Sequence, residues 1–305
     1  MEPHEFQALA DYLPRHIPGF AGLVDSKRFS GGQSNPTYLL TAASGRYVLR
    51  RKPGGAILPS AHAIDREYRL LQALRPTAVP VATPLHYCHD AGVIGAEFYV
   101  MDFLDGVLHW DPALPDLAGG LRRPATLAMV DALAALHRVD WQAAGLGDFG
   151  KPGDYAARQI ARWSRQFRAT QDGSYPQMEL LIAHLEANLP ADDGRATLVH
   201  GDYRIDNLMY ERDSAGVMAV LDWELATIGH PFADLAYMLM HHRLPNGGVF
   251  HGLGGIDRDA GNLPSADDIT ARYARGIGAD RIDNLDFWIS LAAFRLAAIL
   301  EGVRA

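Results

Sequence analysis

The stretch from residue 200 to 237 constrains this chain most, because it places three oxygen-bearing side chains at fixed spacings. Asp202 is followed five residues later by Asn207, and Asp222 lies fifteen residues after that. The apolar residues around them predict a loop that leaves a short strand, then a hairpin whose far strand ends at Asp222. Oxygen ligands on a loop and a strand end suit Mg²⁺, which takes few protein ligands. Asp202, which precedes Asn207 on the same loop, could receive a proton from a hydroxyl group.

This stretch resembles the phosphoryl-transfer motifs of protein kinases, in which the same Asp, Asn and Asp occur in this order. Here the loop reads HGDxxxxN and the metal motif reads DWE in place of DFG. Both variants are typical of the aminoglycoside phosphotransferase and choline kinase group, which are kinase-like enzymes acting on small molecules. The longer sequence HGDYRIDN…LDWELATIGHPFADLAY is most similar to one branch of this group, whose members occur alone in bacteria and fused to acyl-CoA dehydrogenases in eukaryotes.

The resemblance implies a two-lobed α+β fold of the protein-kinase type. An antiparallel sheet lobe would span residues 1–103, and a mainly helical lobe would span residues 104–305. The implied reaction moves the γ-phosphoryl group of ATP to a hydroxyl of a small-molecule acceptor, with Asp202 as the base and Asn207 and Asp222 holding Mg²⁺. The alternatives are an aminoglycoside or other amino-sugar phosphotransferase, and a nucleotide-binding pseudokinase without catalysis.

A glycine-rich turn between the first two predicted strands is a candidate for phosphate binding. Glycines let backbone N–H groups approach an anion closely, and serine and asparagine side chains add donors. The resemblance implies that this turn covers the phosphates of ATP, whereas the alternative is a plain hairpin turn. The residues concerned are Gly31, Gly32, Ser34 and Asn35.

The third predicted strand ends on basic residues where a kinase carries its phosphate-binding lysine. Arg50 occupies that place, and strand alternation puts Lys52 on the same face. A guanidinium can contact two phosphate oxygens at once, so we expect Arg50 to be the clamp, with Lys52 as the alternative. Glu67, on a helix predicted over residues 62–74, matches the glutamate that pairs with this cation in kinases. An edge strand with solvated bases is the other interpretation.

A further strand pair is predicted over residues 85–89 and 97–103, and the family resemblance makes its end the hinge. The backbone C=O of Asp102 and the backbone N–H of Leu104 would then face the edge of adenine. Beyond Gly106 the pattern becomes helical. The same resemblance implies that Asp234, at the start of one of these helices, braces the loop that carries His200 and Asp202.

The acceptor cannot be read from the kinase motifs, which contact only phosphate and metal. We expect its site among the helices after Gly106 and the long loop over residues 245–264. An arginine-rich helix over residues 156–170 is either a solvated helix face or part of a site for an anionic acceptor, such as a hydroxyacyl thioester of coenzyme A. His241 and His242 are expected to be structural. The arginines are Arg158, Arg162, Arg165 and Arg168.

Composition sets broad limits on the remaining properties. The net charge is −8 without a long basic run, so nucleic acid is not an expected partner. The single cysteine, Cys88, allows no internal disulfide and is typical of the cytoplasm. The most apolar helix is interrupted by Arg295, so no membrane span is expected. The oligomeric state is left open.

Overall fold

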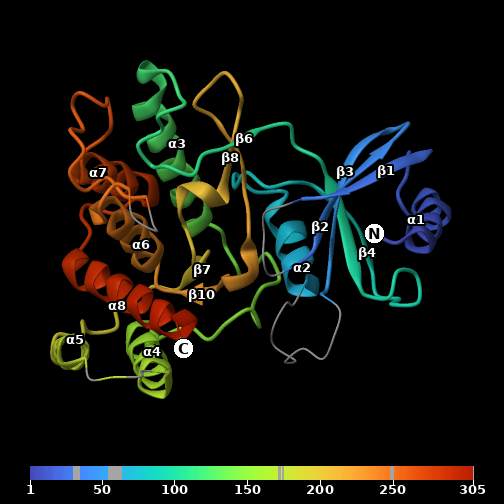
Figure 1. Ribbon diagram of the computed structural model, residues 1–305. Helices are drawn as coiled ribbons and strands as arrows, with labels where there is room; N and C mark the ends of the chain where they lie inside the picture. Colours follow the sequence, from blue (N-terminus) through green and yellow to red (C-terminus); the bar gives the residue numbers. More distant parts are fainter. Residues whose placement is uncertain (30–34, 54–63, 171–172, 174, 248–250, 305) are drawn as a thin grey trace. The chain divides into compact units, whose positions relative to one another are not determined.

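The computed structural model describes residues 1–29, 35–53, 64–170, 173, 175–247 and 251–304 (Figure 1). By its contacts the chain divides into two compact units. The N-terminal unit comprises Met1–Gly106 together with Asp222–Glu224, and the C-terminal unit comprises Val107–Leu221 and Leu225–Ala305. The division therefore falls three residues after the predicted boundary at residue 103, and the DWE segment belongs to the N-terminal unit.

The N-terminal unit is built on a five-stranded sheet in the order β1-β2-β3-β5-β4, in which every neighbouring pair is antiparallel. This confirms the predicted antiparallel lobe. Its elements are α1 (Pro3–His16), β1 (Leu23–Arg28), β2 (Thr37–Ala42), β3 (Gly45–Arg51), α2 (Ile64–Leu74), β4 (Pro84–Cys88) and β5 (Phe98–Asp102).

The two-residue alternation of the strands explains how this sheet forms a core. In β2 every second side chain is buried, including the fully buried Leu40. Leu9 and Leu13 of α1 join Leu40 and Leu49 in one apolar cluster. In helix α2 a charged side chain takes a buried position, because Glu67 is buried whereas the adjacent Tyr68 is only half-buried. Glu67 is buried because it pairs with a basic side chain of β3.

The C-terminal unit is mainly helical and holds two small sheets, β6-β8-β9 and β10-β7. Its helices are α3 (Gly119–His137), α4 (Tyr155–Thr170), α5 (Pro176–Ala187), α6 (Phe232–Arg243), α7 (Ala266–Ile277) and α8 (Leu285–Arg304). Its strands are β6 (Val107–Leu108), β7 (Thr197–Val199), β8 (Leu208–Tyr210), β9 (Val217–Val220) and β10 (Thr227–Gly229). Two short 3₁₀ helices cover Ile205–Asn207 and Trp223–Leu225. The second begins in the N-terminal unit, which includes residues up to Glu224, and ends in the C-terminal unit.

Helix α6 is the centre of this unit, since nearly all of its side chains are buried. It packs against α8, which also packs against α4, while α3 packs against α7 (Figure 1). Gly276 brings α3 and α7 unusually close, because a Cβ atom there would lie 2.6 Å from Cβ of Ala134. Among the described helices, none combines the length and the apolar character that crossing a bilayer requires.

Candidate active site

The predicted catalytic loop begins where β7 ends, and its path depends on Gly201. This residue has a φ of +84°, a conformation that L side chains rarely adopt. A Cβ atom at this position would also lie 2.7 Å from the backbone O of Leu225. Glycine is therefore required immediately before Asp202, and it fixes the direction in which the loop leaves the strand.

Asp234 braces this turn from α6, as the sequence predicted. The backbone N–H of His200 donates to its Oδ2 at 2.6 Å, and the N–H of Gly201 donates to its Oδ1 at 2.9 Å. Nε2 of His137 is a third partner at 3.2 Å. Burial raises the pKa of Asp234, but the hydrogen bonds from His137 and from the backbone outweigh burial and hold the pKa below its usual value. The loop is thus anchored by a buried carboxylate.

Asn207 is oriented by Asp202, five residues earlier. Its Nδ2 donates to the backbone O of Asp202 at 2.9 Å and to Oδ2 of the same residue at 3.0 Å. Both acceptors are oxygens, so the amide nitrogen must face them and Oδ1 is the atom that can coordinate a cation. Asn207 also fixes the strand that precedes the DWE segment, since its backbone O accepts the N–H of Leu221 at 2.8 Å.

Two further side chains contact the Asp202 carboxylate. Nε of Arg204 lies 3.6 Å from its Oδ2, while Nη2 of Arg204 pairs with Asp206 at 2.7 Å. Tyr237 of α6 forms a hydrogen bond with Asp202, and burial together with this carboxylate raises the pKa of the tyrosine. No spacing in the sequence indicated a role for Tyr237, although it lies in the same stretch, because its contact depends on how α6 packs.

In the N-terminal unit, Arg50 joins two carboxylates. Its Nε lies 3.1 Å from Oε2 of Glu67, and its Nη2 donates to Oδ1 of Asp222 at 3.1 Å. Burial lowers the pKa of Arg50, but Glu67 and Asp222 raise it further, so the guanidinium stays charged. Burial raises the pKa of Glu67 against the opposing charge of Arg50. The pairing of strand cation with helix glutamate is therefore present.

The basic residues next to Arg50 have other partners. Nζ of Lys52 contacts Glu97 at 2.7 Å, and Arg51 points to the other face, where it pairs with Glu5 at 2.7 Å. Of these three basic residues, Arg50 is thus the one that lies beside Glu67 and Asp222. Asp222 itself has a φ of +60°, which is uncommon for a residue with a side chain and marks a locally strained backbone.

The remaining predicted nucleotide contacts are only partly described. Gly31, Gly32 and Ser34 lie outside the described residues, whereas Asn35 is buried two residues before β2. Asp102 is the last residue of β5, and its N–H donates to the backbone O of Thr83 at 3.0 Å. Leu104 follows in an irregular segment. The roles of these residues remain predictions.

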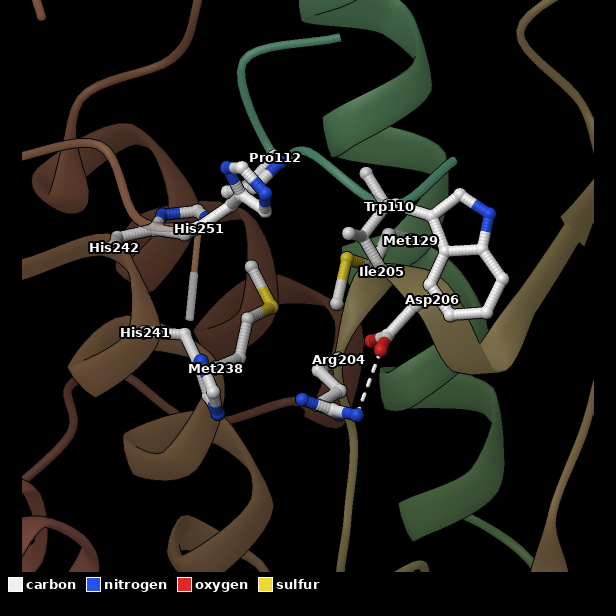
Figure 2. Close-up of a pocket in the computed structure, with 10 residues that line it drawn as sticks. All are labelled: Trp110, Pro112, Met129, Arg204, Ile205, Asp206, Met238, His241, His242 and His251. Carbon is white, nitrogen blue, oxygen red and sulfur yellow. Dashed lines mark ion pairs between the residues drawn. The ribbon is translucent and has the colours of Figure 1, made fainter. Parts of the chain in front are cut away.

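A cavity of about 340 Å³ opens beside the catalytic loop in the C-terminal unit (Figure 2). Side chains of α6 form one wall, and residues of α3 and of the catalytic loop form the wall facing it. The segment after β6 and the segment after α6 complete the lining. The lining residues are Trp110, Pro112, Met129, Arg204, Ile205, Asp206, Met238, His241, His242 and His251. This volume lies within the usual range of small-molecule sites.

Two residues of opposite charge in the lining of this cavity compensate each other. Arg204 and Asp206 neutralise each other across 2.7 Å. Burial lowers the pKa of His241 to about 4, with a further contribution from Arg204. Burial lowers the pKa of His242 to about 3, helped by Arg258. Both histidines, expected from the sequence to be structural, also line this cavity.

The α4 arginines do not contribute to this cavity. Arg158 donates to the backbone O atoms of Gly153 and Lys151, in the segment just before its own helix. Arg168 pairs with Glu179 of α5, and Arg162 lies over the ring of Trp163. Within the described part of the chain, none of the four arginines lines the cavity. The structure therefore favours the solvated helix face over an anionic-acceptor site.

Because His241 and His242 are buried with lowered pKa values, we expect the protein to lose stability in mild acid. In the unfolded chain they bind protons near pH 6.5, but in the folded chain only near pH 4 and pH 3. Their stabilising contribution is complete above pH 6.5 and falls as the pH is lowered, by up to about 1.4 kcal/mol per pH unit for each group. Urea unfolding between pH 7 and pH 5 measures this slope. The free energy of unfolding should depend less on pH in the double variant His241→Gln/His242→Gln than in the wild type. The variant His251→Gln, at an exposed position, should behave like the wild type. The same pH dependence in the wild type and both variants would contradict the prediction.

Comparison with known proteins places this geometry in a family. Residues 25–265 match the model of the "Phosphotransferase enzyme family". Acyl-CoA dehydrogenase family member 10 of Mus musculus is 42% identical over 299 residues, which cover 96% of this chain and 28% of the mouse protein. The chain thus spans less than a third of that relative.

Two solved structures share the fold. A Ralstonia eutropha protein assigned to the aminoglycoside phosphotransferases has a TM-score of 0.89 and 40% identity, over 97% of this chain and 88% of that one. A choline kinase of Cryptosporidium parvum has a TM-score of 0.69 at 12% identity, over 97% and 89% of the two chains. The fold is therefore of the kinase-like type that the sequence predicted. The chain belongs to the phosphotransferase enzyme family.

Proposed function

We propose that this protein is an ATP-dependent kinase that phosphorylates a hydroxyl group of a small molecule. The observation that carries the proposal is the arrangement around Asp202, whose carboxylate is held by Asn207 on a loop that Asp234 anchors. A carboxylate fixed in this way can orient an acceptor hydroxyl and take its proton. A pseudokinase is expected to lack the base or a metal ligand, and Asp202, Asn207 and Asp222 are all present.

Mg²⁺ suits the donor atoms that this chain offers. Oδ1 of Asn207 and the carboxylate of Asp222 are hard oxygen ligands, and the Asp222 side chain is 39% exposed. When bound, the ion would neutralise charge on the phosphates. Arg50, held in place by Glu67, would bind phosphate oxygens through its guanidinium. The protein's contribution is then mainly positioning and charge compensation.

The cavity beside the catalytic loop is the proposed acceptor site. Arg204 and Asp206 in its lining pair with each other, and Met129, Ile205 and Met238 add apolar surface, so it suits an uncharged and largely aliphatic part of a ligand. A polycationic aminoglycoside needs a dense carboxylate lining, whereas Asp206 is the one carboxylate among the described residues that line this cavity. The relative named for an acyl-CoA dehydrogenase family suggests a hydroxyacyl thioester, whose acyl chain would occupy the cavity.

An ATP-consumption assay with two classes of acceptor tests this proposal. We expect turnover with 3- or 4-hydroxyacyl-CoA and none above background with kanamycin-like amines. Trp110, 65% exposed at the cavity, offers a surface variant with little risk to folding. Trp110→Ala should raise the acceptor KM by about tenfold, or about 1.4 kcal/mol, without changing the ATP KM.

Leu180→Ala serves as the matched control, because Leu180 is 71% exposed on α5 and does not line the cavity. Strong phosphorylation of the amines, with none of the thioesters, would overturn the acceptor assignment and leave the kinase assignment standing. Failure to consume ATP with either class, in the presence of Mg²⁺, would count against the kinase itself.

A further inference from the structure

A buried chain of polar groups extends from Asp234 to a helix that the sequence did not connect with the catalytic loop. Nε2 of His137, the last residue of α3, lies 3.2 Å from Oδ2 of Asp234. Nδ1 of the same ring lies 2.6 Å from the hydroxyl of Tyr273 on α7. The side chains of His137 and Asp234 are 0% and 2% exposed, and Tyr273 is fully buried.

The donors and acceptors in this chain can be assigned from the groups present. Asp234 receives two backbone N–H donors, from His200 and Gly201, so its carboxyl group acts as an acceptor. Nε2 of His137 must then carry a hydrogen to donate to Oδ2. A fully buried imidazole needs no second proton if Nδ1 can accept a hydrogen bond, and the Tyr273 hydroxyl is a donor at that nitrogen.

We propose that Tyr273 is a positioning residue whose hydroxyl donates to Nδ1 of His137, keeps the ring in its neutral Nε2–H tautomer, and thereby secures the bond that orients Asp234. The carboxylate in turn holds the turn before Asp202. Tyr273 thus acts on the proposed phosphoryl transfer without touching substrate, and this part of the inference rests on the proposed function.

The packing of α3 against α7 supports this assignment. The absence of a side chain at Gly276, one turn after Tyr273, permits the close approach of Ala134, one turn before His137. On the exposed side, Arg272 binds Asp131 through two contacts of 2.7 Å. The close approach at Gly276 therefore sets a helix separation that suits a short Tyr273–His137 hydrogen bond, whereas the exposed ion pair contributes little to it.

Two variants separate the hydroxyl from the general packing. Tyr273→Phe removes the donor and keeps the ring, whereas Arg272→Gln removes a contact between the same helices at the surface. With Tyr273→Phe we expect kcat for Mg·ATP turnover to fall by about tenfold or more, without a change in the ATP KM. Arg272→Gln should leave both parameters at wild-type values. Wild-type kcat in Tyr273→Phe would overturn the positioning role.

Nitrogen-15 NMR of the imidazoles tests the tautomer without relying on activity. The signal of His137, assigned by its loss in His137→Gln, should be that of a neutral Nε2–H ring in the wild type and should split or shift in Tyr273→Phe. Gly276→Ala, which forces α7 away from α3, should cause the same change if Tyr273→Phe does not fold. An imidazolium or an Nδ1–H ring in the wild type would overturn the proposal. A protein without kinase activity that still shows the expected tautomer would refute the proposed function alone.

Discussion

Replacing Asp202 with alanine is expected to lower phosphoryl transfer from Mg·ATP by about 10²- to 10⁴-fold, the range typical of a lost general base. The reason is that Asp202 is the carboxylate oriented by Asn207 and placed by the Gly201 turn, whereas the phosphate-binding candidates Arg50 and Glu67 are separate from it. Nucleotide binding should therefore be retained. Initial rates with a saturating acceptor, together with calorimetric titration of ATP, measure both quantities.

Asp213→Ala is the control for this experiment, because Asp213 is an exposed carboxylate on the turn between β8 and β9. It changes the net charge by the same amount and should not affect either measurement. If Asp202→Ala turned over ATP as fast as the wild type, the base would have to be assigned to another residue.

Changing Asp222 to asparagine should weaken ATP binding in the presence of Mg²⁺ by at least about tenfold and affect metal-free binding much less. Loss of a group that merely supports a metal ligand already costs 10- to 100-fold in metal affinity, and Asp222 is proposed to be a ligand itself. Asparagine keeps the shape and tolerates the positive φ of this position. Titrations of nucleotide with Mg²⁺ and with a chelator measure the two affinities.

The control is Asp105→Asn, an exposed carboxylate of the same unit that pairs with Arg46 at 3.2 Å. It should leave both affinities unchanged. Equal losses with and without metal in Asp222→Asn would move Asp222 from the metal site to a role in fixing Arg50, with which it already forms a hydrogen bond.

Local patterns were sufficient to predict the sheet of the N-terminal unit. Alternating side chains and glycine-rich turns define β1, β2 and β3, and pairing between consecutive strands then follows from short connections. The pairing of Arg50 with Glu67 was also predictable, but only from the resemblance to kinases. Apolar periodicity alone would not bury Glu67, and only its ion pair with Arg50 accounts for its burial on α2.

The general region of the proposed acceptor site could be predicted, but the residues that line the cavity could not, because they are far apart in the sequence. Trp110, Met129, Ile205, Met238 and His251 come from five segments, and no spacing rule connects them. The same limit applies to the arginines of α4. Their spacing predicted a charged helix face correctly, but only the packing of the helix shows which surface that face covers.

Likewise, the contact of His137 with Tyr273 joins residues 136 positions apart. Each residue alone reads as part of an ordinary helix. Such contacts are set by how helices pack, and Gly276 gave no local indication that α3 would approach it so closely.

Trp110 gives the cavity an intrinsic optical probe. Of the five tryptophans, Trp163, Trp223 and Trp288 are buried and Trp141 is half-buried, whereas the indole of Trp110 is largely open to water. A ligand that enters the cavity would displace water from this ring, and the colour and intensity of its fluorescence depend on that contact. Acceptor candidates can therefore be ranked by emission alone, before any phosphorylated product has been identified.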